Sequence, residues 1–191
     1  MKVVAFNGSA RKGGNTSQLL STVLEELNAN GVETELVELA GKPLSGCIAC
    51  YKCVKNKDQR CSGPKDDMNE YIEKMIEADG ILLGSPTYFA DATATIKALI
   101  ERTGMVGRAN GDLYARKVGA SVVAVRRAGA FHVFSTLNAF FLIANMIVIG
   151  SSYWNLGRGK DKGDVQNDAE GLKTMRDLGQ NMAWTLKKLK A

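Results

Sequence analysis

The feature that most constrains the fold of this chain is a regular alternation of short apolar runs with longer segments of helical spacing. Four runs are apolar on both faces, namely Lys2–Phe6, Ile81–Pro86, Val118–Val125 and Met146–Gly150. Strands of this kind are typical of parallel sheets covered by helices on both sides. A fifth run, Val32–Leu39, alternates apolar with charged residues, which indicates a half-buried strand near a sheet edge.

Between these runs, apolar side chains recur every three or four residues. The predicted helices are Leu19–Leu27, Asp67–Ala78, Ala92–Arg102, Phe131–Asn145 and Leu172–Leu189. Strands that alternate with helices predict a three-layer α/β sandwich around a five-stranded parallel sheet, and 191 residues suit one such domain over 1–191. Because these sheets bind ligands at the carboxyl ends of their strands, the loops after the first, third and fourth strands are the candidate sites.

All four cysteines lie in one segment, residues 44–65, which we call the cysteine segment. They are Cys47, Cys50, Cys53 and Cys61, with the spacing C-x2-C-x2-C-x7-C. The start of the chain offers neither a secretory leader nor an apolar run long enough to cross a membrane, so we expect a cytoplasmic protein without membrane contact. In a reducing compartment, clustered thiols are expected to bind metal or act in redox chemistry.

The charge pattern argues against nucleic acid as a partner. The formal net charge is +5, and the basic residues are scattered without a long basic run or an interleaved aromatic series. An anionic cofactor or an acidic protein partner is compatible with this charge. Five basic residues surround the cysteines and favour the same kinds of partner, although a solvated loop would carry them equally well; they are Lys52, Lys55, Lys57, Arg60 and Lys65.

The loop after the first strand, Asn7–Gln18, predicts a phosphate site. It is rich in glycine and hydroxyl groups, and its backbone N–H groups would act together with the positive end of the following helix. Its glycines fit neither G-x-x-x-x-G-K-[ST] nor G-x-G-x-x-G, so a bound phosphate monoester is favoured over a hydrolysed nucleotide. The alternative is that Asn15 or Thr16 only caps the helix.

The loop after the third strand carries aromatic residues where a flat ring would lie. Pro86 fixes the direction of the chain, and Thr87, Tyr88 and Phe89 follow it. The alternative is that Tyr88 and Phe89 simply pack into the core.

Taken together, these motifs resemble a known family. "GSARKGGNTSQLL" looks like the phosphate loop of the flavodoxin-like NAD(P)H-dependent FMN reductases, and "GSPTYFADATATIKALIER" looks like their loop around the flavin ring. "CIACYKC", "DDM" and "GSSYWNLGRGKDKGDVQNDAEGLK" resemble the iron–sulfur flavoproteins within that superfamily. The likeness covers nearly the whole chain. Ala10 replaces the usual proline, and no flavin contacts are assigned within Val125–His132, whose residues are not matched one by one to the family.

The resemblance implies a sheet of order 2-1-3-4-5 and two cofactors, FMN and a [4Fe-4S] cluster. FMN would be bound at its phosphate by Ser9, Arg11, Asn15, Thr16 and Ser17, and at its ring by Pro86, Thr87, Tyr88 and Phe89. The cluster ligands would be Cys47, Cys50, Cys53 and Cys61. Zinc or free redox thiols remain alternatives for the cysteines, whereas the single histidine, His132, is expected to pack or cap its helix.

The implied activity is electron transfer from ferredoxin, or another carrier, to a small oxidant. Two alternatives stay open: a cluster-free NAD(P)H-dependent FMN or quinone reductase, and a non-enzymatic binding module with a zinc-stapled loop. Residues 150–170 show no apolar period, and "SSYWN" at Ser151–Asn155 carries two aromatics. We expect this arm to reach a neighbouring subunit of a homodimer or homotetramer, or else to fold back on its own domain.

Overall fold

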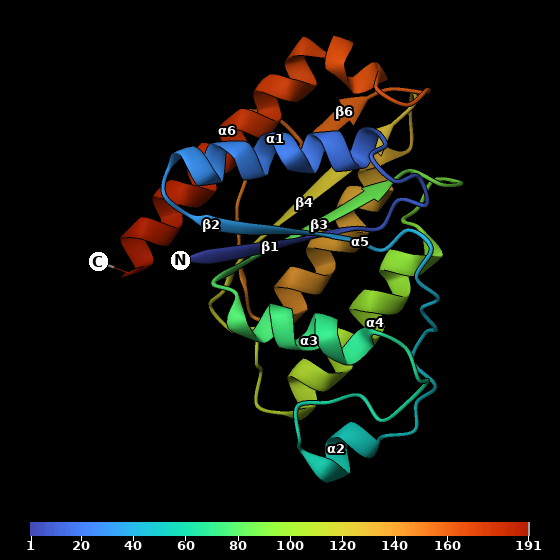
Figure 1. Cartoon of the computed structure of the whole chain (residues 1–191). Helices are drawn as coiled ribbons and strands as arrows, with labels where there is room; N and C mark the ends of the chain where they lie inside the picture. Colours follow the sequence, from blue (N-terminus) through green and yellow to red (C-terminus); the bar gives the residue numbers. More distant parts are fainter. Residues whose placement is uncertain (191) are drawn as a thin grey trace.

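The sheet at the centre of the molecule has the predicted order. The computed structural model describes residues 1–190 and arranges five parallel strands in the order β2-β1-β3-β4-β5 (Figure 1). They are β1 (Lys2–Asn7), β2 (Glu33–Glu38), β3 (Gly80–Pro86), β4 (Val118–Val125) and β5 (Ile147–Val148). Every pairing in the sheet is parallel. The α/β class and the strand order are therefore confirmed. The class follows from the apolar strands, since strands buried on both faces need helical cover on each side.

The fifth position of the sheet is shared by two short strands. β5 pairs only with the first two residues of β4, and a further strand, β6 (Leu156–Arg158), pairs with Val123–Val125 at the other end of β4. Between them the chain leaves the sheet edge, and Asn155 returns to it by accepting a hydrogen bond from the N–H of Val123 (2.9 Å). Part of the arm expected at 150–170 therefore forms a strand within the central sheet of the same chain.

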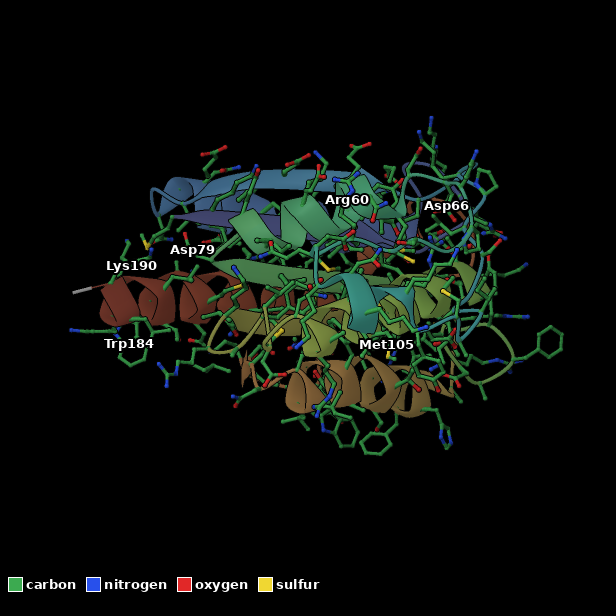
Figure 2. The ribbon with its side chains drawn as sticks, turned by 90° about the horizontal axis from the view of Figure 1, so that it is seen from below. Arg60, Asp66, Asp79, Met105, Trp184 and Lys190 are labelled. Carbon is green, nitrogen blue, oxygen red and sulfur yellow. The ribbon has the colours of Figure 1, made fainter. Side chains whose placement is uncertain are left out.

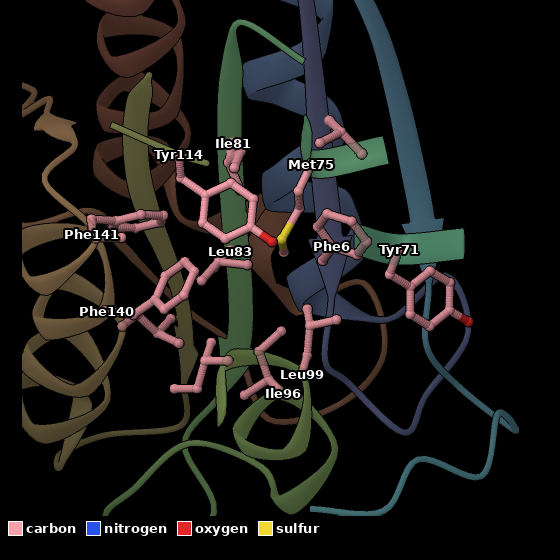
Figure 3. Packing of buried hydrophobic residues seen from close by; sticks show 14 of the residues in the cluster. Phe6, Tyr71, Met75, Ile81, Leu83, Ile96, Leu99, Tyr114, Phe140 and Phe141 are labelled. Carbon is pink, nitrogen blue, oxygen red and sulfur yellow. The ribbon is translucent and has the colours of Figure 1, made fainter. Parts of the chain in front are cut away.

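Helices cover both faces of the sheet (Figure 1). On one face lie α1 (Asn15–Ala29) and α6 (Ala169–Lys190), which pack on each other. On the other lie α3 (Met68–Glu77), α4 (Ala94–Ala109) and α5 (Ala130–Ile143). Each face has its own buried apolar cluster. The cluster under α3, α4 and α5 is rich in aromatics, with the Phe6 and Tyr71 rings edge to face at 5.8 Å (Figure 3).

Three helical features differ from the prediction. α4 runs seven residues past Arg102 to Ala109. Gly107 is needed inside the extended helix because a Cβ there would lie 2.7 Å from the Tyr114 ring. The cysteine segment contains a five-residue helix, α2 (Lys52–Asn56), and a 3₁₀ turn, η1 (Asp164–Asn167), precedes α6. Within residues 1–190, no helix is both long and apolar enough to span a bilayer.

Candidate functional site

The loop between β1 and α1 is shaped by its own polar side chains. The Ser9 N–H donates to Asn7 Oδ1 (3.0 Å), and the Arg11 N–H donates to Ser9 Oγ (3.1 Å). α1 is capped by Gly14 without a side-chain hydrogen bond. The helix-cap alternative for Asn15 and Thr16 is therefore wrong, and the first-turn N–H groups of α1 remain free of side-chain caps.

The 159–164 stretch closes this loop from the side. Arg11 Nη1 donates to Lys160 O (3.2 Å), Asn15 Nδ2 donates to Asp161 O (2.9 Å), and the Gly163 N–H donates to Asn15 Oδ1 (2.9 Å). Asp164 shapes the turn by accepting hydrogen bonds from the N–H groups of Asp161 (2.8 Å) and Lys160 (3.0 Å). These bonds hold the pKa of its carboxyl below the ordinary value. The second half of the expected arm thus folds against its own phosphate loop.

The carboxyl ends of β1, β3, β4 and β6 surround a cavity of about 310 Å³, which we call the sheet-end cavity. Its lining residues are Ser9, Arg11, Asn15, Thr16, Pro86, Thr87, Tyr88, Ala124, Arg126, Gly159 and Lys160. It therefore unites seven of the nine residues expected at FMN. Three of the lining residues are cationic, and no carboxylate of the described chain lines the cavity, so its field favours an anionic ligand.

Two buried hydroxyls indicate what the sheet-end cavity is built to hold. Thr16 Oγ1 and Thr87 Oγ1 are buried and have no hydrogen-bond partner in the described part of the chain. A buried hydroxyl without a partner costs free energy, so these two groups call for a ligand with polar atoms at both ends of the cavity. A ligand with phosphate oxygens beside Thr16 and further polar atoms beside Thr87 would satisfy both hydroxyls.

Two expected FMN residues do not face the sheet-end cavity. The Ser17 hydroxyl donates to Glu38 Oε1 (2.6 Å) on β2. Phe89 is fully exposed at the tip of its loop, where Phe89 and Ala90 both have positive φ (46° and 66°). Tyr88 is also 45% exposed, which excludes the alternative that this aromatic pair packs as core. Arg126, Gly159 and Lys160 line the cavity although the sequence did not single them out.

The cysteine segment lies against the C-terminal half of α4, with Met105 beside α2 (Figure 2). All four cysteines are free thiols and line one apolar pocket together with Arg102, Met105 and Val106. Cys53 is buried, and burial raises the pKa of its thiol. The backbone around them turns tightly through four residues with positive φ, namely Ala49, Tyr51, Lys57 and Gln59.

The pocket around the cysteines can be compared with the needs of two kinds of metal centre. Zinc needs its sulfurs within about 2.3 Å of a single point. A four-iron cluster binds each thiolate at a different iron, so its four sulfurs surround a common volume. Among residues 1–190, no three His, Cys, Asp or Glu side chains converge on a position for one ion. Four thiols around one apolar pocket are the donor set that a cluster requires.

Arg102 is a residue of this second site that sequence reasoning missed. Its side chain is 1% exposed and donates to Asp66 Oδ2 (2.5 Å), and its Nε donates to Cys61 Sγ (3.3 Å). Burial alone would lower the pKa of the guanidinium, but the bonds to Asp66 and Cys61 hold it above its ordinary value. Arg102 therefore brings a fixed positive charge to a cysteine sulfur.

Comparison with known proteins places these features in a family. Residues 1–161 match the family model of the NADPH-dependent FMN reductases. An iron–sulfur flavoprotein of Methanocaldococcus jannaschii is 39% identical over 197 residues, which cover 100% of both chains. The iron–sulfur flavoprotein of Methanosarcina thermophila is 31% identical and covers 95% of this chain and 93% of its own.

Solved structures show the same fold at lower identity. The crystal structure of RosB with bound 8-demethyl-8-formylriboflavin-5'-phosphate has a TM-score of 0.79 at 20% identity and covers 100% of this chain and 80% of its own. A flavodoxin-like WrbA protein of Agrobacterium tumefaciens has a TM-score of 0.68 at 13% identity and covers 98% and 97%. With its sheet-end cavity and full-length relatives, the chain belongs to the iron–sulfur flavoproteins of the NADPH-dependent FMN reductase family and is a flavin-dependent oxidoreductase.

Proposed function

We propose that this protein passes electrons between a one-electron carrier and a small oxidant through FMN in the sheet-end cavity and a [4Fe-4S] cluster on the four cysteines. The observation that carries the proposal is that Cys47, Cys50, Cys53 and Cys61 all line one pocket as free thiols. A cytoplasmic location belongs to the proposal, because thiols persist in a reducing compartment.

The chain's own residues divide the binding of FMN between two ends of the sheet-end cavity. Ser9, Arg11, Asn15 and Thr16 would hold the phosphate, with Arg126 and Lys160 adding positive charge. The ring end would rest on the Pro86–Tyr88 backbone and the Tyr88 side chain. Asn15 and Thr16 are fixed by α1 and Pro86 by the end of β3, which favours a cavity that is formed before the cofactor binds.

The two sites are joined by α4. Thr93, which caps α4, donates its hydroxyl to Gly8 O in the phosphate loop (2.7 Å), and Arg102 of the same helix contacts Cys61. From Ala94 to Arg102 the helix rises about 12 Å, at 1.5 Å per residue. When bound, the cluster supplies single electrons and the flavin exchanges one or two, so together they couple a one-electron donor to a two-electron acceptor.

The surface around the cysteines suits an acidic electron carrier such as ferredoxin. Ile48, Tyr51 and Val54 expose 63%, 57% and 41% of their surface beside the pocket. Lys52, Lys55 and Lys57 flank them, and none of these three lysines forms an ion pair within residues 1–190. An apolar centre with a basic rim is the arrangement expected for a transient complex with an acidic protein.

The carrier surface can be tested by charge reversal. Lys52→Glu with Lys55→Glu is expected to lower the rate of reduction by reduced ferredoxin at least about tenfold at low ionic strength. Lys187→Glu with Lys188→Glu, at the far end of α6, is the matched control and should leave this rate unchanged. Equal rates for both variants would contradict ferredoxin docking at this surface.

A homodimer or homotetramer is also part of the proposal. Phe131, Tyr153 and Trp154 form an exposed aromatic cluster, with ring centroids 5.3 Å apart for Phe131 and Trp154 and 5.2 Å for Tyr153 and Trp154. Such a cluster is a candidate subunit contact. Light scattering of the wild type and of Trp154→Ser tests it, since an unchanged mass would exclude this cluster from the interface.

The experiment that tests the main proposal is a metal, sulfide and flavin assay on anaerobically purified protein, repeated after Cys50→Ser. We expect four iron and four sulfide per chain with one FMN in the wild type, since a single cluster and a single flavin are proposed. Cys50→Ser should lose iron and keep FMN, whereas the neighbouring control Ala49→Ser should keep both. Zinc in place of iron, or loss of FMN together with iron, would contradict the proposal.

A cluster-free NAD(P)H-dependent reductase is a second candidate, because a separate observation favours it. Beside the sheet-end cavity lies an open depression lined by four basic residues and one carboxylate, namely Arg126, Arg127, Arg158, Lys160 and Asp164. The Asp164 carboxylate accepts from two backbone N–H groups, and the excess of positive charge suits the phosphates of a nicotinamide dinucleotide. Rapid flavin reduction by NADPH in an iron-free wild-type preparation would favour this candidate. Reduction by ferredoxin alone would favour the first.

A further inference from the structure

Arg102 directs its hydrogen bonds to both ends of the cysteine segment. Nη1 donates to Asp66 Oδ2 (2.5 Å) and to Ser45 O (3.2 Å), and Nη2 donates to Pro64 O (3.0 Å). Nε donates to Cys61 Sγ (3.3 Å). Asp66 completes the closure by accepting from the Ser45 N–H (3.4 Å). One side chain of α4 therefore joins the point where the segment leaves the domain to the point where it returns.

Arg102 lies on the buried face of α4, where its charge loses the solvation of water at a cost in free energy. Leu99, Thr103 and Val106 occupy the same buried face of the helix. An apolar residue in that row would fill the space without desolvating a charge, and replacing a buried ion pair with apolar residues is often neutral or stabilising. The guanidinium is therefore explained by what it holds, which is the cysteine segment, rather than by the stability of the core.

The other anchors of the cysteine segment are exposed or only partly buried. On α3, Asn69 accepts from the Cys61 N–H (2.7 Å) and donates to Cys61 O (3.1 Å), and Glu73 pairs with Arg60. From Cys47 to Arg60 only Cys53 is buried, and four of these residues have positive φ. The Cys47 N–H has one polar contact with α4, to Glu101 Oε2 (3.3 Å), and Glu101 is exposed. A segment with little buried surface opens easily unless it is tied at its ends. Arg102 and Asp66 supply that tie in a buried, charged form.

We propose that Arg102 is a positioning residue with two effects: it holds the cysteine segment in the shape that gathers the four sulfurs, and it raises the reduction potential of the cluster through Cys61. The second effect rests on the proposed function. A cationic N–H donor on a ligand sulfur favours the state with the extra electron, since that state places more negative charge on the sulfurs.

The test compares Arg102→Gln, which removes the charge, with Arg102→Lys, which keeps the charge but cannot form the same fork of bonds. Arg108→Gln is the control, because Arg108 lies on the same helix, is exposed, and donates to Ile143 O (2.9 Å) outside the segment. Hydrogen exchange of the 45–66 amides is measured in purified protein. The measurement is repeated in the Cys50→Ser background, so that loss of metal alone does not explain faster exchange.

We expect the 45–66 amides to exchange at least about tenfold faster in both Arg102 variants and at the wild-type rate in Arg108→Gln. In iron-loaded protein, redox titration followed by electron paramagnetic resonance should give a more negative cluster potential for Arg102→Gln, with Arg102→Lys between it and the wild type. Bound FMN verifies that each variant is folded. If Arg102→Gln does not fold, Arg102→Lys decides through its exchange rates and its potential.

Unchanged exchange in a folded Arg102 variant would overturn the positioning role, and an unchanged potential would overturn the effect through Cys61. These failures differ from that of the proposed function. Wild-type protein without an iron–sulfur cluster would overturn both the proposed function and the effect on potential. The exchange rates in the Cys50→Ser background would still decide the positioning role.

Discussion

The phosphate loop and the cysteine segment present their functional groups in opposite ways. The phosphate loop follows a buried central strand, and its residues Asn7, Ser9, Thr16 and Ser17 are all buried. The cysteine segment leaves the edge strand β2 and is mostly exposed, with Cys53 as its one buried cysteine. The first site takes its shape from the sheet, whereas the second depends on side-chain bonds to α3 and α4.

This difference teaches where each site is vulnerable. Damage to the phosphate loop requires a change of packing at the end of the sheet, because backbone shape and buried contacts define it. For the cysteine segment we expect the largest effect at a single ion pair, because the pair of Arg102 and Asp66 is buried at 1% and 5% side-chain exposure. The substitutions that follow are chosen to separate these two kinds of support.

The largest effect is expected at Asp66. Asp66→Asn leaves the Arg102 charge buried without its partner, which should lower the free energy of unfolding by about 3 kcal/mol in denaturant titrations at neutral pH. Asp67→Asn is the control, because Asp67 pairs with Lys42 at 2.9 Å on the exposed surface, and its loss should not be measurable. Equal stability of the two variants would show that the buried pair does not support the cysteine segment.

The contrast between the two regions also explains what the sequence could predict. Buried strands appear in the sequence as apolar runs, so the strands and the position of the phosphate loop could be predicted from these runs. The order of the strands came from the family resemblance. Arg102 was not identified, because a charged residue is normally expected on the exposed side. The signal was present nonetheless, since the apolar spacing continues through Leu99, Thr103 and Val106 and places Arg102 in the buried row.

Other parts of the sheet-end cavity depend on contacts between distant segments. Lys160 and Gly159 reach the phosphate loop because β6 joins the end of β4, and a three-residue strand has too little periodicity to be read from sequence. Ser17 was assigned by its place in a motif, yet its hydroxyl is taken by Glu38 of the neighbouring strand. Motif position gives the loop, whereas hydrogen-bond partners decide which member faces the ligand.

The next effect should come from Gly159, where the arm meets the phosphate loop. A Cβ there would lie 2.6 Å from Asn15 Nδ2 and 3.0 Å from the Val165 N, so alanine forces the two segments apart at a cost of about 2 kcal/mol. We expect Gly159→Ala to weaken FMN binding more than tenfold in fluorescence titrations. Gly150→Ala, with open space around its Cβ position, should bind FMN as the wild type does. Normal binding by both variants would exclude the arm from the site.

A smaller effect is expected from a pair of neighbouring hydroxyls in α1. Thr16→Val removes a buried hydroxyl that has no partner in residues 1–190, so FMN affinity should fall about tenfold, or about 1.4 kcal/mol, while the flavin-free protein keeps its melting temperature. Ser17→Ala should show the reverse, with near-normal FMN affinity and lower stability, because its hydroxyl bonds to Glu38. Titration and thermal melting of both variants decide which hydroxyl serves the ligand.

The smallest effect is expected at the β2 edge, which lies outside both sites. It gives the contribution of an exposed ion pair to stability, with which the effects at the two sites can be compared. Glu35 accepts from Lys74 (2.6 Å) and pairs with Lys2 (3.2 Å), and the Lys74 hydrogen bond holds the pKa of Glu35 below its ordinary 4.5. A lowered carboxyl pKa gives stability that is present above pH 4.5 and is lost as pH falls through the folded-state pKa. Glu35→Gln should therefore be less stable than the wild type by about 0.5 kcal/mol at pH 7, after allowance for solvent screening, and equally stable below the folded-state pKa. In denaturant titrations, a difference in the free energy of unfolding that stayed constant across this pH range would contradict the ion pair. A difference as large as that of Asp66→Asn would show that buried and exposed pairs contribute equally to stability.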